Sequence, residues 1–201
     1  MLCGYHAGMT DIEQTRVRDV QALKAIAHPL RGRLLGALRQ HGPATATELA
    51  VRFGESSGAT SYHLRQLARY GFVVDAEDQS SRRERRWRAA AMFTSWDDAD
   101  FIDDPAGREA SDAVHDRLVA YMRRRDRQWR TRMADWDRAW SRSAGISDIQ
   151  VRLTPEATAR LVDQVLALAR RFEAQSQADP GSAIVSVIVQ AVPVHPEDVD
   201  P

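Results

Sequence analysis

Residues 45–74, TATELAVRFGESSGATSYHLRQLARYGFVV, contain two amphipathic segments separated by a short turn. Thr45 and Glu48 have the T-x-x-E spacing of a capping box, in which each side chain satisfies a backbone N–H at the start of a helix. Gly54 can take the positive φ of a tight turn, and Ser56 is a preferred N-cap for a following helix. The pattern therefore predicts a helix, a tight turn and a second helix.

Helices are also predicted before this stretch, and a hairpin after it. Apolar residues recur at helical spacing over residues 15–27, and Pro29 suits the first position of the next helix. Downstream, residues 72–74 and 85–88 are strand-like and flank a polar loop. This order of elements is that of a winged helix-turn-helix, which we place at residues 15–96.

The rest of the chain is predicted to add one long helix and a smaller mixed unit. Five segments lie outside the winged helix-turn-helix, namely a disordered N-terminus (1–14), an acidic linker (97–110), a long amphipathic helix (111–143), a C-terminal β-α-β unit (147–193) and a tail (194–201). Within the β-α-β unit we expect strands at 149–153 and 183–192 around a helix that starts at Pro155. The predicted fold class is thus mostly α with small β.

Charge is distributed unevenly along the chain. The 28 basic and 28 acidic residues cancel, which by itself argues against a nucleic-acid binder. Residues 1–90, however, hold 14 basic and 9 acidic residues, a net of +5, whereas residues 91–201 hold 14 and 19, a net of −5. Such an asymmetry indicates that the first half faces a polyanion. No signal peptide or membrane span is evident, so we expect a soluble, cytoplasmic protein.

The start of the second helix of the motif has the chemistry that the major groove requires. Base edges are recognised by small and polar side chains at the N-terminal end of such a helix. The candidate DNA contacts on this helix are Ser56, Ser57, Thr60, Ser61, Tyr62, His63 and Arg65, with Arg65 placed on the DNA backbone. A basic run in the hairpin would bind phosphates, and its members are Arg82, Arg83, Arg85 and Arg86. We therefore expect binding that depends steeply on salt.

The predicted long helix has an apolar stripe that suits a dimer interface. The stripe consists of Leu118, Met122, Trp129, Met133, Trp136 and Trp140. A single winged helix covers half a site, and a two-fold dimer doubles the readout when half-sites lie about one DNA turn apart. We therefore expect a homodimer assembled by the C-terminal half, and a cavity there for a small apolar effector is left open.

The run from Ala22 to Ala89 resembles the ArsR-like winged-helix repressors. The stretch ALKAIAHPLRGRLL is similar to that family's first and second helices, and TELAVRFGESSGATSYHLRQLARYGFV is similar to its helix-turn-helix and first wing strand. The resemblance implies a bacterial transcriptional regulator, a dimeric repressor at a palindromic double-stranded DNA operator. Release of the operator by an effector is left open. It also implies groove contacts from four of the candidates, Ser57, Ser61, Tyr62 and His63.

The chain departs from that family in its cysteines. Founding members sense thiophilic metals through cysteine pairs, whereas this chain has the single Cys3, so we expect no metal and no cofactor. It contains no GxSxG, HExxH, P-loop or dinucleotide-binding glycine pattern, so we expect no enzyme and no catalytic residue. The alternative hypothesis is a winged helix that binds another protein and no DNA. A groove-facing helix together with an arginine-rich hairpin argues against it.

Overall fold

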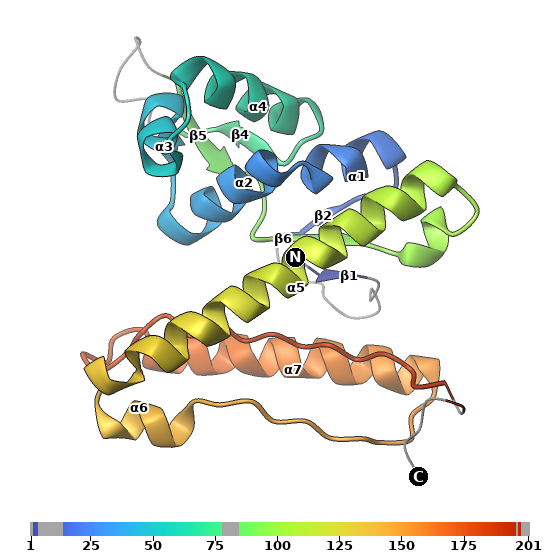
Figure 1. Cartoon of the computed structure of the whole chain (residues 1–201), viewed down its shortest axis with the longest axis vertical. Coiled ribbons are helices and arrows are strands. Elements are labelled where there is room, and N and C mark those ends of the chain that lie inside the picture. Colours follow the sequence, from blue (N-terminus) through green and yellow to red (C-terminus); the bar gives the residue numbers. More distant parts are fainter. Residues whose placement is uncertain (1, 4–13, 78–84, 196, 198–201) are drawn as a thin grey trace. The chain divides into compact units, whose positions relative to one another are not determined.

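The computed structural model describes residues 2–3, 14–77, 85–195 and 197. They divide into two compact units, residues 14–121 together with Leu2–Cys3, and residues from 122 onward (Figure 1). The described elements are mostly helices with two small sheets, which confirms the predicted fold class at that level. No helix in the described ranges has the length and hydropathy that crossing a membrane demands.

Four helices form the framework of the first unit. They are α1 (Val20–Ala27), α2 (Pro29–His41), α3 (Ala46–Phe53) and α4 (Ser57–Arg69). The predicted capping box is present, because Glu48 N donates to Thr45 Oγ1 at 3.1 Å and Thr45 N donates to a Glu48 carboxylate oxygen at 2.7 Å. Gly54, at φ 68°, makes the left-handed turn into α4, whose first turn is capped by Ser56. The predicted helix-turn-helix is therefore confirmed, caps included.

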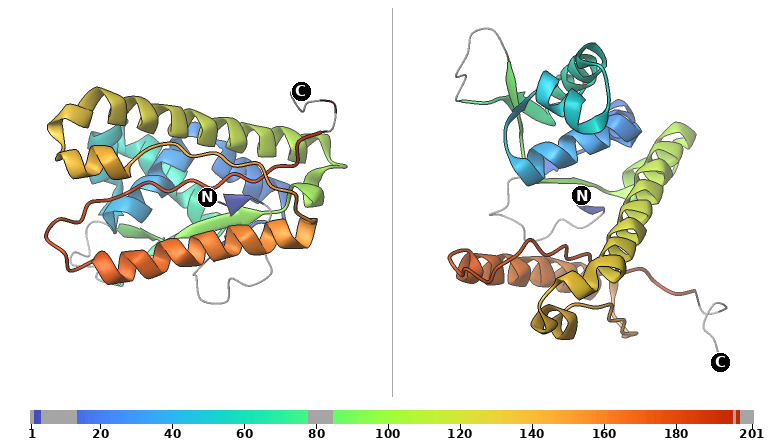
Figure 2. Two further views of the ribbon diagram at one scale, coloured as in Figure 1. Left: turned by 90° about the horizontal axis from the view of Figure 1, so that it is seen from below. Right: turned by 60° about the vertical axis from the view of Figure 1, so that its left-hand side comes forward.

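A three-stranded antiparallel sheet forms the wing. Its strands are β3 (Ala44–Thr45), β4 (Val73–Asp75) and β5 (Arg86–Ala89), in the order β3-β5-β4. Val73 pairs with Ala89 and Asp75 with Trp87, which is the register of a hairpin. The right-hand view in Figure 2 shows this hairpin beside α3 and α4. The predicted hairpin is confirmed, and residues 78–84 of its loop lie outside the described residues.

A second sheet was not predicted. β6 (Phe93–Trp96) pairs in parallel with β1 (Leu2–Cys3) and β2 (Gln14–Arg16). The prediction of disorder over residues 1–14 is therefore wrong for Leu2–Cys3, and residues 4–13 lie outside the described residues. The first helix starts at Val20 and not near Thr15, because residues 14–16 pair with a strand almost eighty residues away in sequence.

The core of the first unit extends past the predicted domain boundary at residue 96. Phe101, in the short 3-10 helix η1 (Asp98–Phe101), and Val114, in α5 (Pro105–Arg132), are buried in the same cluster as Leu23 and Leu64. The prediction of an acidic linker over 97–110 is therefore wrong. The aspartates of this segment suggested exposure, yet they surround a phenylalanine that is only 2% exposed.

The second unit contains less regular structure than the sequence predicted. After α5 come a 3-10 helix η2 (Met133–Asp135), α6 (Arg138–Ser143) and α7 (Pro155–Ser176). The predicted helix over 111–143 is wrong at both ends, since α5 starts at Pro105 and ends at Arg132. The predicted strands at 149–153 and 183–192 are also wrong, because these residues pair with no strand in the described part of the chain, and Figure 2 shows them as irregular segments. Thr154 caps α7 as expected.

Candidate nucleic-acid interface

Helix α4 has one buried face and one exposed polar face. Thr60, Leu64 and Leu67 are completely buried against the core. The opposite face shows residues at four-residue spacing, Ser57, Ser61, Arg65 and Arg69, with Gly58 and Tyr62 beside them. Ser61 is half-buried, the other five are exposed, and Tyr62 is 53% exposed. This stripe of small, hydroxyl and guanidinium groups is what a groove-reading helix needs, since donors and acceptors must reach base edges and phosphates.

Two of the predicted contacts on α4 have other roles. Thr60 is 0% exposed, so its side chain cannot contact DNA and its assignment is corrected. The Ser56 hydroxyl accepts a hydrogen bond from Ala59 N at 3.1 Å, which makes it the N-cap of the helix. The first turn of α4 contains no acidic residue, so its free N–H groups can meet a phosphate without repulsion.

His63 packs inward against the junction of α1 and α2. Its ring centroid lies 4.5 Å from that of His28 and 5.2 Å from that of Tyr62. Burial lowers the pKa of His63, and neighbouring Arg31 lowers it further, while Glu55 acts in the opposite direction. The prediction that His63 projects outward is therefore corrected. Sequence reasoning missed His28 as its partner, because no local pattern indicates a contact between residues so far apart in the chain.

The described arginines of the wing are engaged inside the domain. Arg85 pairs with Asp75, and its guanidinium lies 3.9 Å from the centroid of the Trp87 ring. The hydrogen bond from Arg85 lowers the pKa of the Asp75 carboxyl. Arg86 donates to the carbonyl oxygen of Pro43 at 2.7 Å and lies 3.8 Å from Glu48. Arg85 and Arg86 therefore brace the hairpin.

The other two arginines predicted for the wing, Arg82 and Arg83, lie outside the described residues. Arg39 is a further basic residue of the first unit with an internal role. It is half-buried and donates to Ala91 O at 2.9 Å and to Thr94 Oγ1 at 2.7 Å. Burial lowers its pKa to about 10, so it remains a cation at neutral pH. The net charge of +5 over residues 1–90 therefore overstates the positive charge that this part of the chain presents to solvent.

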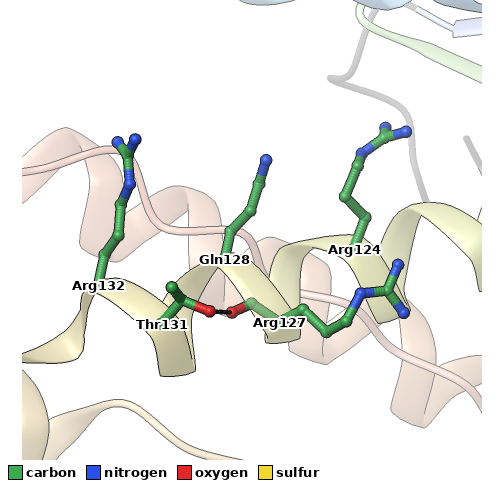
Figure 3. Close-up of a pocket in the computed structure, with 5 residues that line it drawn as sticks. All are labelled: Arg124, Arg127, Gln128, Thr131 and Arg132. Atoms are coloured by element: carbon green, nitrogen blue, oxygen red, sulfur yellow. Dashed lines mark hydrogen bonds between the residues drawn. The ribbon is translucent and has the colours of Figure 1, made fainter.

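A second group of arginines lies on α5 in the second unit. Arg124, Arg127, Gln128, Thr131 and Arg132 line an open hollow (Figure 3). Arg124, Gln128 and Arg132 extend from the same side of the helix, as four-residue spacing dictates. All five side chains are exposed, which is typical of a solvated helix face. The described residues contain no cluster of histidine, cysteine or carboxylate groups that could hold a metal ion.

The predicted dimer stripe is divided among several elements. Leu118 belongs to the first unit, and the other five belong to the second. Trp129, on α5, lies 6.4 Å from Trp136, which in turn lies 5.7 Å from Trp140 on α6. Met133 and Trp136 are 41% and 44% exposed. The tryptophans thus form a cluster across the break after α5, and one side of that cluster remains accessible.

Comparison with known proteins gives the first unit its family. Residues 26–75 match the model of a helix-turn-helix domain family. The solved structure of a "Possible transcriptional regulator for arsenical resistance" is 31% identical over 50% of this chain and 94% of that one, with a TM-score of 0.31. The first unit is an ArsR-like winged helix-turn-helix domain. This confirms the resemblance predicted from the sequence, and domains of this type occur in DNA-binding transcriptional regulators.

Two other solved structures are similar over a longer part of the chain but at low identity. The transcriptional regulator Tm0710 from Thermotoga maritima is 14% identical over 81% of this chain and 90% of its own, with a TM-score of 0.31. RV1404 from Mycobacterium tuberculosis is 16% identical over 80% of this chain and 83% of its own, also with a TM-score of 0.31. No curated protein matches the sequence. The assignment of the first unit to its family therefore rests on the family model and on the 31% identity.

Proposed function

We propose that this protein is a sequence-specific, dimeric transcriptional repressor that inserts α4 into the major groove of a palindromic operator. The observation that supports this proposal is the exposed stripe of α4, opposite a face that is completely buried. Ser57, Ser61 and Tyr62 would meet base edges, and Arg65 and Arg69 would hold phosphates on either side. Arg82 and Arg83 would add phosphate contacts from the wing. The repressor role follows from the family resemblance.

A dimer accounts for the apolar surface of the second unit. Among its described residues, Val162 is the one buried apolar side chain, whereas Leu161, Leu168 and Phe172 of the same helix are 41%, 42% and 58% exposed. A stripe of this kind is unsafe in water unless it is covered. A second copy would cover it and would present two α4 helices to two half-sites about one DNA turn apart.

Selection from a random double-stranded DNA library tests the proposal directly. The full-length protein should enrich an inverted repeat whose half-sites are about 10 base pairs apart. Affinity for the enriched duplex should fall with salt, with a slope of about −0.9 per neutralised phosphate on a double-logarithmic plot. A folded protein that enriches no sequence and binds random duplex without salt dependence would instead support the protein-interaction hypothesis.

The same enriched duplex can be used to test for a dimer. Light scattering of the full chain should give twice the chain mass, and the complex should contain two chains per inverted repeat. One chain per repeat at saturating concentration would contradict the dimer and leave the DNA-binding proposal in place.

A further inference from the structure

Two histidines join α4 to the junction between α1 and α2. His28 is the residue between these two helices, and its ring lies 4.5 Å from that of His63 on α4, with 36° between the ring planes. The Nδ1 atoms of both rings are buried and make no hydrogen bond within the described part of the chain. The contact that His28 and His63 add to the apolar packing of α4 is therefore a ring contact, whose stability depends on the charge of the rings.

Arg117 of α5 holds the other side of the same junction. Its Nη1 donates to the carbonyl oxygen of Ile26 and lies 3.5 Å from that of His28. The guanidinium occupies the space beside Gly32, where an added Cβ would lie 2.6 Å from Arg117 Cζ. An arginine from α5 thus supports the backbone that carries His28, and His28 in turn contacts α4.

The charged groups around the two rings disfavour their protonation. His28 faces His63, Arg31 and Arg117, and His63 faces Arg31 and Glu55. Among the described groups that act on the two rings, Glu55 is the one acid. Burial lowers the pKa of His28, and His63, Arg31 and Arg117 lower it further. Burial and Arg31 likewise lower the pKa of His63. Both rings are therefore neutral at pH 7, since each pKa lies below the usual 6.5.

We propose that the neutral His28–His63 pair, supported by Arg117, positions α4 for DNA binding and releases it when the pair is protonated. This inference rests on the proposed function. Two adjacent imidazolium groups beside Arg31 and Arg117 would repel each other, with Glu55 alone to compensate. The packed arrangement of α4 would lose stability, and DNA affinity would fall with it.

The direction of the pH dependence separates this role from a direct contact with DNA. A histidine whose pKa is lowered by packing takes up its proton more readily in the displaced state, so the packed state loses stability as the pH falls below 6.5. A histidine that touches a phosphate gains a favourable charge on protonation, so binding would strengthen over the same range. The two roles predict slopes of opposite sign.

The experiment measures the affinity of the full-length protein for its enriched duplex between about pH 7.5 and pH 5.5 at constant ionic strength. Circular dichroism at each pH defines the range in which the protein is folded. We expect affinity to fall by up to about tenfold per pH unit below pH 6.5, the limit for uptake of one proton. The variants His28→Gln and His63→Gln remove the titrating ring and keep a neutral polar side chain, so each should flatten the profile. His41→Gln removes an exposed histidine at the end of α2 and should keep the wild-type slope.

Three results would overturn the inference. They are affinity that is independent of pH in the wild type, affinity that rises as the pH falls, and a slope that persists in both glutamine variants. A proton titration of the free protein by NMR gives a readout without DNA, in which His28 and His63 should each titrate below the ordinary histidine value of 6.5. Titration of His63 above 6.5 would also contradict the inference. Lack of specific binding by the wild type at pH 7.5 would instead contradict the proposed function.

Discussion

The two units of this chain contain similar helices but bury them very differently. Leu64 on α4 is completely buried, whereas Leu168 on α7 is 42% exposed. Both helices begin at a hydroxyl N-cap, Ser56 and Thr154. The local signals that form a helix are thus equally strong in both, but only the first unit supplies the distant residues that cover its apolar faces. We infer that the first unit is stable alone and that the second depends on a partner chain.

Shortening the chain at two positions should produce the largest effects. A chain that ends at Trp96 loses Phe101 and Val114, and burial of each such side chain is worth about 1.5–3 kcal/mol. It also removes Asp98 and Ser111, which both accept from Trp96 Nε1 at 2.9 Å. We expect this chain to be largely unfolded by circular dichroism.

A chain that ends at Tyr121 should be folded and monomeric by light scattering, and should bind the enriched duplex weakly. A folded dimer ending at Tyr121 would show that the first unit makes the dimer.

The features that the sequence predicted correctly depend on neighbouring residues, and those that it missed depend on contacts between distant residues. Caps at Thr45 and Ser56, the turn at Gly54 and the hairpin were correct because each depends on residues close together in the chain. β2 was missed because residues 14–16 form a strand only by pairing with β6. The contact between His28 and His63 is equally non-local.

The errors in the second unit have a different cause. The β-branched run 183–192 has the composition of a strand, but composition does not supply a neighbour, and these residues pair with no strand in the described chain. The helix predicted through residue 143 was continued across Met133–Asp135, where the apolar spacing persists although the helix ends at Arg132. Apolar spacing indicates which face needs cover and does not say where a helix stops.

Matched leucine substitutions test whether the two cores differ as described. Leu64→Ala should lower the free energy of unfolding by about 2–5 kcal/mol, because it leaves a cavity in a closed core. Leu168→Ala should cost less than about 1 kcal/mol at low protein concentration, since its side chain is already partly in water. Denaturant unfolding at two protein concentrations measures both. A Leu168→Ala cost that grows with concentration would place this leucine in the dimer, and an equal cost for both leucines at every concentration would refute the difference.

Substitutions on the polar face of α4 should have the next largest effect, a loss of affinity for specific DNA. Ser61→Ala combined with Tyr62→Ala should weaken binding to the enriched duplex by about 1–3 kcal/mol for each base that the side chains no longer reach, with little effect on random duplex. Fluorescence anisotropy with both duplexes measures the difference. Ile102→Ala is the control, because it removes an exposed apolar side chain that is proposed neither for DNA binding nor for the dimer. Equal affinity of the folded double variant and the wild type would remove α4 from the groove.

Substitutions in the wing should weaken binding to specific and to random duplex by similar factors. Arg82→Ala with Arg83→Ala should reduce the slope of the salt dependence by about one unit for each phosphate that is no longer neutralised. Arg85→Ala serves as the comparison, because Arg85 is already paired with Asp75. It should leave the slope nearly unchanged. A weakening confined to the specific duplex would place Arg82 and Arg83 at base edges.

Paired arginine substitutions on the two units give the sharpest test of the comparison. Arg65→Ala with Arg69→Ala should reduce the salt slope by about two units if each guanidinium holds one phosphate. Arg127→Ala with Arg132→Ala removes the same charge from the exposed face of α5 and should leave the slope unchanged. Net charge falls equally in both variants, so a long-range field acting on DNA would shift both slopes by similar amounts. Only local contact from the first unit predicts a change in the α4 variant alone, and a matching change in the α5 variant would mean that both units bind DNA.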